Sequence, residues 1–341
     1  MPAITEAELK DRIKKNPAGA YLICGDESYL VKVYTEKLIK ASVDDSFADF
    51  NLHIFDGEET DLSDVYESCT AVPMMAESKC VVVKDYPVES VSDLPSDAIR
   101  TLLQDNPEDN CLIFSYPATK QSGKGFAELT NIFSEYGFVV KFSKKTEADL
   151  IKIVENGAAK RGKPFEKGAA QYFVRIIGDD LNLLGNEIEK VCAYADTTVG
   201  RKEIDAVCTK SLSLKTFDMI KELTAGHFDS AFHMLSGLFA QREDEFMILG
   251  ALISQYSDIY RAKAAKKASL SPEAVADYYS GYKSKKFVLN NAARISSGLS
   301  FSQLGECLEI LSEADLKMKS SGENPRRILE QAMVRLARVG R

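Results

Sequence analysis

The sequence is poor in the residue patterns that usually mark an enzyme or a metal-binding protein. It has three histidines in 341 residues: His53, and His227 and His233 six positions apart. They form no group with Asp, Glu or Cys at the spacing of a metal site, and no Gly-x-Ser-x-Gly segment is present. We therefore expect no catalytic residue and no metal site, and we interpret the histidines as structural.

Paired cysteines and long apolar runs are also missing. The seven cysteines include no Cys-x-x-Cys pair and mostly lie in apolar stretches, which predicts reduced core residues. No run reaches the about 18 apolar residues of a membrane span. The segment Met1–Glu6 carries no basic-then-apolar signal pattern. These absences predict a cytoplasmic protein without membrane contact.

A strand-turn-helix pattern near the start of the chain has the form of a nucleotide-binding P-loop but lacks its functional side chains. The apolar segment Ala20–Cys24 leads into Gly25, Asp26, Glu27 and Ser28, and no Lys-Ser or Lys-Thr pair follows. A P-loop uses that Lys on the phosphates and the hydroxyl on Mg²⁺. The carboxylates instead put negative charge where phosphates would sit. This degenerate turn is predicted not to bind nucleotide.

Other parts of a P-loop ATPase are absent as well. The apolar strand Cys111–Phe114 is followed by Ser115-Tyr116-Pro117, not by an acidic pair that would hold Mg²⁺. The nearby Gly123-Lys124 lacks both the earlier glycine and the following hydroxyl of the motif. We therefore expect neither nucleotide hydrolysis nor a bound cofactor.

The apolar pattern divides the chain into three predicted domains. Short apolar strands alternate with helical segments over residues 20–142, which is typical of a parallel sheet covered by helices on both faces. Beyond residue 145 only helical patterns remain, with Thr146 and Asp180 as expected caps. We predict an α/β domain over 1–142, a small three-helix domain over 143–212 and a helical domain over 213–341. The expected strands are Tyr21–Cys24, Asn51–Phe55, Cys80–Val83, Cys111–Ser115 and Phe138–Lys141.

Charge is unevenly distributed along the chain. Residues 1–140 hold 12 Lys and Arg against 25 Asp and Glu, a net −13, whereas the remaining residues carry a net +5. If nucleic acid is a partner, attraction to its phosphates is expected to come mainly from beyond residue 140; the alternative for the first part is a solvated acidic face. Arg261, Lys263, Lys266 and Lys267, at the end of a long predicted helix, form a candidate surface for DNA or an acidic neighbour. The alternative is a solvated face with cations near a helix C-terminus.

The predicted third domain is rich in apolar helix faces. Leu249, Leu252, Phe301, Leu308 and Met333 are more than one internal core is expected to hold. Surplus apolar surface marks an oligomer interface. These positions therefore predict contact with other subunits.

Two consecutive methionines follow a predicted helix over Leu62–Cys69. Pro73 is expected to end this helix, and Met74 and Met75 come directly after it. Two adjacent side chains at such a turn do not easily face one core, and flexible methionine suits a hydrophobic pocket on another protein. The alternative is that both pack against the edge of the sheet.

Four segments, in order, resemble the delta subunit of the bacterial DNA polymerase III clamp loader. They are Tyr21–Leu30, Phe55–Glu58, Val72–Asp85 and Asp180–Lys190. The resemblance spans nearly the whole chain and includes the domain order. It implies an AAA+-like fold, with a Rossmann-type sheet domain, a small three-helix domain and a helical collar domain. It also implies a subunit that binds no ATP.

The resemblance implies a mechanical function. Val72, Pro73, Met74 and Met75 occupy the place where the family inserts a hydrophobic pair into the sliding clamp, although Phe is common at the position of Met75. Such a subunit helps to open the clamp for loading onto primed DNA, and it is a non-catalytic part of the polymerase holoenzyme. The implied partners are the beta clamp, the gamma or tau subunits, delta prime and primed DNA. Two alternatives are an active AAA+-type P-loop ATPase acting on DNA, and a scaffold that does not touch the clamp.

Overall fold

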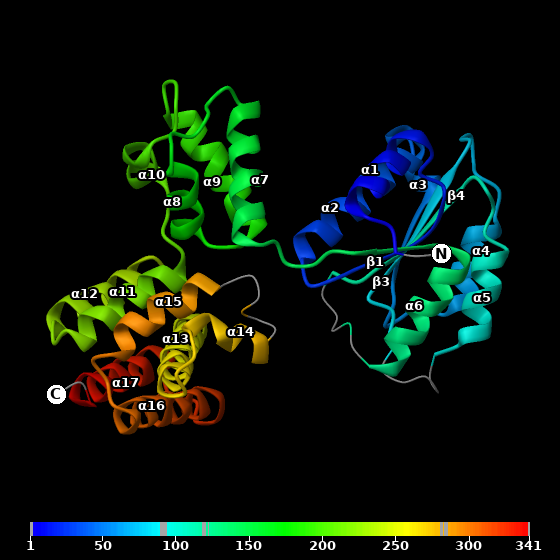
Figure 1. The fold of residues 1–341 in the computed structure, drawn as a ribbon. Coiled ribbons are helices and arrows are strands. Elements are labelled where there is room, and N and C mark those ends of the chain that lie inside the picture. Colours follow the sequence, from blue (N-terminus) through cyan, green and yellow to red (C-terminus); the bar gives the residue numbers. More distant parts are fainter. Residues whose placement is uncertain are drawn as a thin grey trace. The chain divides into compact units, whose positions relative to one another are not determined.

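The chain forms two compact units, residues 1–144 and 145–341, in a computed structural model that describes residues 3–88, 94–117, 121, 123–279, 282 and 286–339. The first unit contains a parallel sheet and the second is helical (Figure 1). The predicted fold class, an α/β part followed by an all-α part, is confirmed. Across the described ranges, no helix combines the length and apolar character needed to span a membrane.

The sheet of the first unit is parallel, with the strand order β2-β3-β4-β1-β5. Its strands are β1 (Gly19–Cys24), β2 (Leu52–Asp56), β3 (Lys79–Lys84), β4 (Asn110–Ser115) and β5 (Phe138–Lys141). All five predicted strands are therefore present, with ends shifted by one or two residues. Asn51 differs from the prediction, because it ends a short helix instead of starting a strand.

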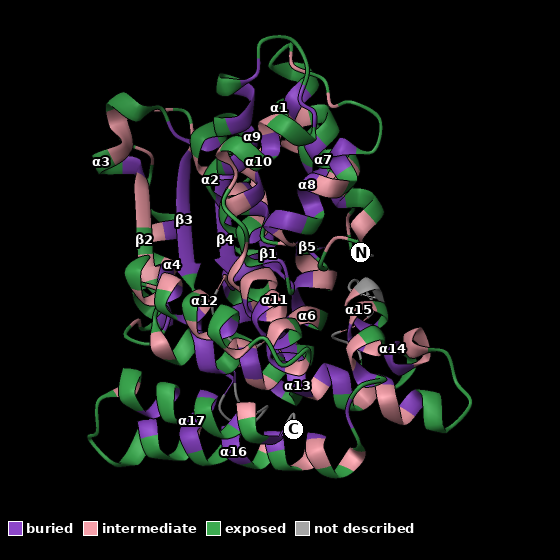
Figure 2. Cartoon of the chain, turned by 90° about the vertical axis from the view of Figure 1, so that its left-hand side faces the viewer, coloured by how far each residue is buried: buried purple, intermediate pink, exposed green. Residues whose placement is uncertain are grey.

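Helices cover both faces of this sheet because side chains alternate along each strand. Leu22 and its cross-strand partner Phe114 pack with α4, α5 and α6 on one face. Tyr21 and its partner Ile113 pack with α1 and α2 on the other. The edge strand β2 is only partly buried (Figure 2). The helices are α1 (Glu6–Lys15), α2 (Ser28–Ser42), α3 (Ala48–Asn51), α4 (Leu62–Thr70), α5 (Ser96–Gln104) and α6 (Lys124–Tyr136), with a 3₁₀ turn at Asp45–Phe47.

The second unit begins with the helices that the caps predict. The Thr146 hydroxyl accepts from the Asp149 amide at 3.2 Å, and the Asp180 carboxylate accepts from the Asn182 amide at 2.8 Å. Such caps satisfy helix N–H groups that have no partner within the helix. A short fourth helix follows the three predicted ones. These helices are α7 (Glu147–Lys160), α8 (Ala169–Ile177), α9 (Leu181–Tyr194) and α10 (Arg201–Val207).

Most of the remaining helices of the second unit share one large core, whereas Val275 of α14 packs in a small separate cluster with Ala265 and Leu289. The remaining helices are α11 (Leu212–Thr224), α12 (Phe228–Ala240), α13 (Glu245–Lys267), α14 (Val275–Tyr278), α15 (Lys286–Ser296), α16 (Phe301–Ser320) and α17 (Pro325–Val339), with a 3₁₀ turn at Pro272–Ala274. Leu249, Leu252 and Met333 are buried in that core, and Leu308 packs against it. Phe301 lies partly buried against Tyr260. Four of the five residues are therefore held in or against one core, contrary to the prediction, whereas Phe301 lies outside that core.

Candidate functional site

The segment between α4 and β3 carries the predicted methionine pair and is fixed at both ends. The buried ammonium of Lys79 donates to the carbonyl oxygens of Ser68, at 2.6 Å, and Ala71, at 2.9 Å. These bonds satisfy carbonyl groups at the end of α4. Burial lowers the pKa of Lys79. At the other end, the Ser78 hydroxyl donates to the carbonyl of Ser42 in α2 at 2.6 Å.

The middle of this segment is held by Asn51. The side-chain carbonyl of Asn51 accepts from the Met74 amide at 2.8 Å, and its amide group donates to the Met74 carbonyl at 2.8 Å. We call residues 71–78, with these three attachments, the anchored loop. The residues that hold it belong to α2, α3 and β3, which are three different parts of the first unit.

The anchored loop exposes its apolar side chains. Val72 is 83% exposed, Met74 54% and Met75 80%. Met75 also has a φ of 53°, a left-handed conformation that is uncommon for a residue other than glycine. Neither methionine belongs to the cores on the two faces of the sheet. Apolar side chains on a fixed backbone suit a pocket on a partner protein.

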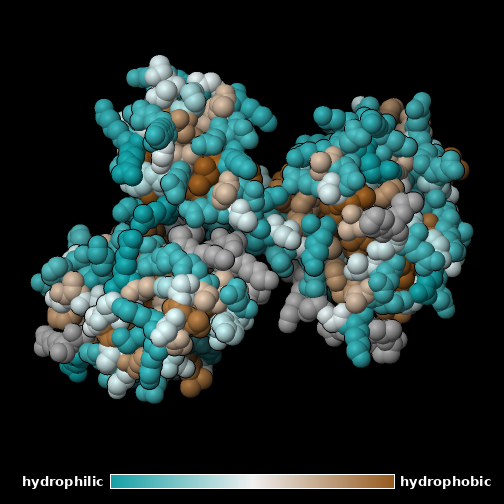
Figure 3. Space-filling view, in the orientation of Figure 1, coloured by the Kyte–Doolittle hydropathy of each residue, from teal (hydrophilic) through white to brown (hydrophobic). Residues whose placement is uncertain are grey.

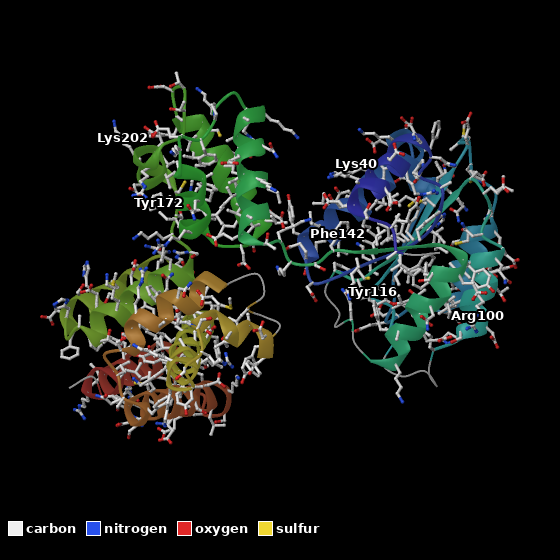
Figure 4. The ribbon with its side chains drawn as sticks, in the orientation of Figure 1. Lys40, Arg100, Tyr116, Phe142, Tyr172 and Lys202 are labelled. Atoms are coloured by element: carbon white, nitrogen blue, oxygen red, sulfur yellow. The ribbon has the colours of Figure 1, made fainter. Side chains whose placement is uncertain are left out.

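The degenerate P-loop is filled by the protein itself. The Gly25 amide, which in a P-loop would point at a phosphate, donates to the side-chain carbonyl of Gln121 at 2.5 Å. The Gln121 amide group donates back to the carbonyls of Gly25, at 3.2 Å, and Tyr116, at 2.8 Å. Tyr116 follows β4 and is labelled in Figure 4. The side chain of Gln121 therefore occupies the hydrogen-bonding position of an anion.

Acidic side chains complete this turn. Glu27 is 2% exposed, and its carboxylate lies 3.3 Å from the Lys144 ammonium. The Glu27 amide donates to the carbonyl of Phe142, also labelled in Figure 4, at 3.1 Å. Asp26 and Ser28 are exposed at the start of α2. The lysine beside this turn thus neutralises a buried carboxylate, and it comes from after β5 instead of from the P-loop position.

The predicted basic cluster of the second unit divides into two pairs. The Arg261 guanidinium donates to the Tyr282 hydroxyl at 2.5 Å and lies 4.8 Å from the centre of the Tyr279 ring. Lys263 donates to the carbonyl of Ser296 at 2.9 Å. Lys266 and Lys267, by contrast, are exposed at the end of α13. Lys266 and Lys267 are therefore the more exposed pair, although the Lys267 ammonium also lies 5.2 Å from the centre of the Phe301 ring.

The three histidines belong to no group of possible metal ligands in the part of the chain that the structure describes. There, no three His, Cys, Asp or Glu side chains come close enough together to hold an ion. His53 lies in β2 and His233 in α12, while His227 bonds to Glu222 at 3.0 Å. The face of the molecule in Figure 3 is mostly hydrophilic, with apolar residues scattered over it.

The sequence predicts the exposed methionines but not the residues that hold them. Its pattern places Asn51 at the start of a strand, and it gives Lys79 no role beyond membership of a longer motif. Gln121 lies outside every predicted site. The only sequence feature that marks Asn51 is that it is a polar residue beside an apolar strand. Such residues are common at strand ends, so this feature does not predict a role in holding the loop.

Comparison with known proteins identifies similarity along most of the chain. The family model described as DNA polymerase III, delta subunit, matches residues 21–143. The model described as DNA polymerase III delta subunit, C-terminal domain, matches residues 213–336. The DNA polymerase III subunit delta of Bacillus subtilis is 20% identical over 325 residues, covering 93% of this chain and 92% of that protein.

A solved structure has the same fold. The Bacillus subtilis DNA clamp loader delta protein YqeN superimposes with a TM-score of 0.65 at 20% sequence identity. The match covers 97% of this chain and 99% of that one. At this level of identity the likeness concerns the fold, which extends over both units.

Proposed function

Because this chain belongs to the delta subunit family of DNA polymerase III and is a clamp-loader subunit, we propose that it binds the sliding clamp and helps to open the ring for loading onto primed DNA. By family it is a non-catalytic subunit of the polymerase holoenzyme. Its place of action is the cytoplasm, where a replication protein meets its DNA. Ring opening needs only that the delta chain binds the open clamp better than the closed one.

The clamp-binding surface is the anchored loop, through Val72, Pro73, Met74 and Met75. The observation that carries this assignment is the exposure of two adjacent methionines, 54% and 80%, on a backbone held by three side-chain attachments. A fixed loop loses little conformational freedom on binding, so more of its burial energy is available as affinity. A hydrophobic pocket on the clamp is the complementary surface.

Alanine substitution of the methionine pair tests this assignment. Burying the exposed parts of both side chains contributes about 2–4 kcal/mol, so Met74→Ala with Met75→Ala is expected to weaken clamp binding roughly 30- to 1,000-fold. Surface plasmon resonance on immobilised clamp measures it. Tyr194→Ala removes another apolar side chain, 55% exposed in α9, and serves as the matched control. Unchanged affinity of a folded double variant would exclude this loop as the clamp-binding site.

The protein performs this function without binding or hydrolysing ATP. Support comes from the turn after β1. There the Gly25 amide donates to the Gln121 side chain, and the Glu27 carboxylate is paired with the Lys144 ammonium. A triphosphate would have to displace Gln121 and approach two carboxylates, with no P-loop lysine to neutralise it. ATP then acts through neighbouring subunits, and the active P-loop ATPase alternative gains no support.

Residues 213–341 form the collar that joins the other loader subunits, gamma or tau and delta prime. Their apolar core is complete, so the interface has to use side chains that this core leaves outside. Met247 in α13, Leu316 in α16 and Val334 in α17 are 64%, 66% and 44% exposed. Exposed apolar side chains on packed helices are suited to helix-on-helix contact between subunits. Lys266 and Lys267 are the groups that support contact with primed DNA.

A further inference from the structure

Asn51 is the last residue of α3, and its side chain is fully buried. It makes hydrogen bonds to both backbone groups of Met74, accepting from the amide and donating to the carbonyl. The same amide group also donates to the carbonyl of Phe47 at 3.1 Å. A side-chain amide has one acceptor oxygen and two donor hydrogens, so these three bonds engage the oxygen and the NH₂ group of Asn51.

The bonds from Asn51 hold the centre of the anchored loop, whereas Lys79 and Ser78 hold its ends. Pro73 precedes Met74, has no amide hydrogen and fixes its own φ near −65°. Met75 follows with a φ of 53°. Once Met74 is paired with Asn51, the rigid residue before it and the left-handed residue after it determine where both methionine side chains point.

We infer that Asn51 is a positioning residue for the clamp-binding surface, holding Met74 and Met75 in their binding conformation before the clamp arrives. This inference rests on the proposed function of the loop. Asn51 itself is buried and does not reach the partner. Without it, two backbone groups of Met74 lose their partners and turn to water, and the loop populates other conformations. The apparent affinity for the clamp is then the intrinsic affinity multiplied by the fraction of molecules that keep the binding conformation.

Kinetics separates this role from direct contact. A loop that has to find its conformation before binding associates more slowly, whereas truncation of a side chain that touches the partner mainly speeds dissociation. Asn51 variants are therefore expected to lower the association rate. Met74→Ala is expected to raise the dissociation rate. A residue with a merely structural role in the sheet would change neither.

The experiment compares Asn51→Ala, Asn51→Asp and the Met74→Ala, Met75→Ala double variant in the full chain. Thr35→Val is the control, because it removes a buried polar group elsewhere, a hydroxyl that bonds to Ser115 at 2.9 Å, without touching the loop. Amide hydrogen exchange measures the loop, and surface plasmon resonance on the sliding clamp measures binding. We expect Asn51→Ala to weaken binding about tenfold or more. The Met74 and Met75 amides should exchange faster while those of β3 stay protected.

Asn51→Asp keeps the size of the side chain and an acceptor for the Met74 amide but loses the donor to the Met74 carbonyl. A buried carboxylate oxygen then faces the carbonyls of Met74 and Phe47, so this variant is expected to weaken binding at least as much as alanine, and either variant decides the question should the other fail to fold. Suppose that a folded Asn51 variant binds the clamp with the affinity and association rate of the control, while the double methionine variant loses binding. That result would overturn the inference and leave the proposed function of the loop standing. If the double variant also binds normally, the proposed function of the loop fails, and the inference fails with it.

Discussion

Gly25 explains why the sequence resembles a P-loop even though the Gln121 side chain occupies the turn where phosphates would bind. Gly25 has a φ of 129°, and a Cβ atom there would lie 2.1 Å from the carbonyl oxygen of Phe142. No larger residue fits so close to that backbone. The turn therefore requires glycine for packing between β1 and the chain after β5, whether or not a nucleotide is bound.

Nucleotide binding is tested by thermal unfolding in the presence of Mg²⁺ and ATP. A ligand at 100 times its Kd would stabilise the folded chain by about 2.7 kcal/mol and raise the melting temperature measurably. We expect no such shift for this chain. Gln121→Ala frees the Gly25 amide, but it leaves Asp26 and Glu27 in place and adds no lysine, so it should also be unresponsive. A saturable shift at micromolar ATP with the unaltered chain would favour the active ATPase instead.

Among the elements, α13 shows how one helix divides its charged side chains between internal and external contacts. Arg261 bonds to Tyr282, whose hydroxyl in turn donates to Asp258. Burial and that bond to Asp258 raise the pKa of Tyr282 to about 12, so its hydroxyl remains a donor at neutral pH. One turn beyond, Lys266 and Lys267 are exposed. The last turn of the helix therefore carries its most exposed cations, one of which, Lys267, also lies 5.2 Å from the centre of the Phe301 ring.

Charge reversal at this end of α13 tests the DNA contact. Lys266→Glu with Lys267→Glu is expected to lower the DNA affinity of the assembled loader and to reduce the slope of log K against log salt by about 0.9 for each lysine–phosphate pair removed. Fluorescence anisotropy with primed DNA at several salt concentrations measures both. Lys14→Glu with Lys15→Glu changes two exposed lysines at the end of α1 and is the matched control. Equal affinities for both variants would assign the lysines to a solvated face.

For the whole molecule, the important feature is that each unit has a core of its own. The sheet of the first unit is enclosed by helices of residues 1–144, and the helices of the second unit enclose theirs within 145–341. The exposed methionine pair lies in the first unit and the exposed lysines in the second. The two proposed contacts, with clamp and with DNA, are therefore separable by cutting the chain.

Fragments should divide the two functions. Residues 1–144 are expected to bind the clamp with about the affinity of the full chain, because the anchored loop and its attachments all lie there. Residues 145–341 are expected to assemble with the other loader subunits and to show no clamp binding. Pull-down with the clamp and with co-expressed subunits measures both. A first fragment that assembles with the loader at full strength would remove the collar role from the second unit. The finer division at residue 212 stays a prediction.

Local patterns in the sequence determined the elements of this protein and the absence of the P-loop side chains. Apolar runs bounded by polar residues predicted the five strands, and Thr146 and Asp180 predicted helix starts, because strand burial and helix capping act between neighbours in sequence. The missing lysine after Gly25 is likewise a local fact. Pro73 correctly predicted where α4 ends, and the two residues after it were correctly predicted not to share one core.

Tertiary structure alone decided which side chains meet across the chain. Gln121 reaches Gly25 over 96 positions, and Asn51 reaches Met74 over 23. The fit of Leu249 and Met333 in one core depended on how the helices cross, which no single helix reveals. Periodicity reports which face of an element is apolar, but not what lies against it. Hydrogen bonds and packing between distant segments depend on distances that only the folded chain sets.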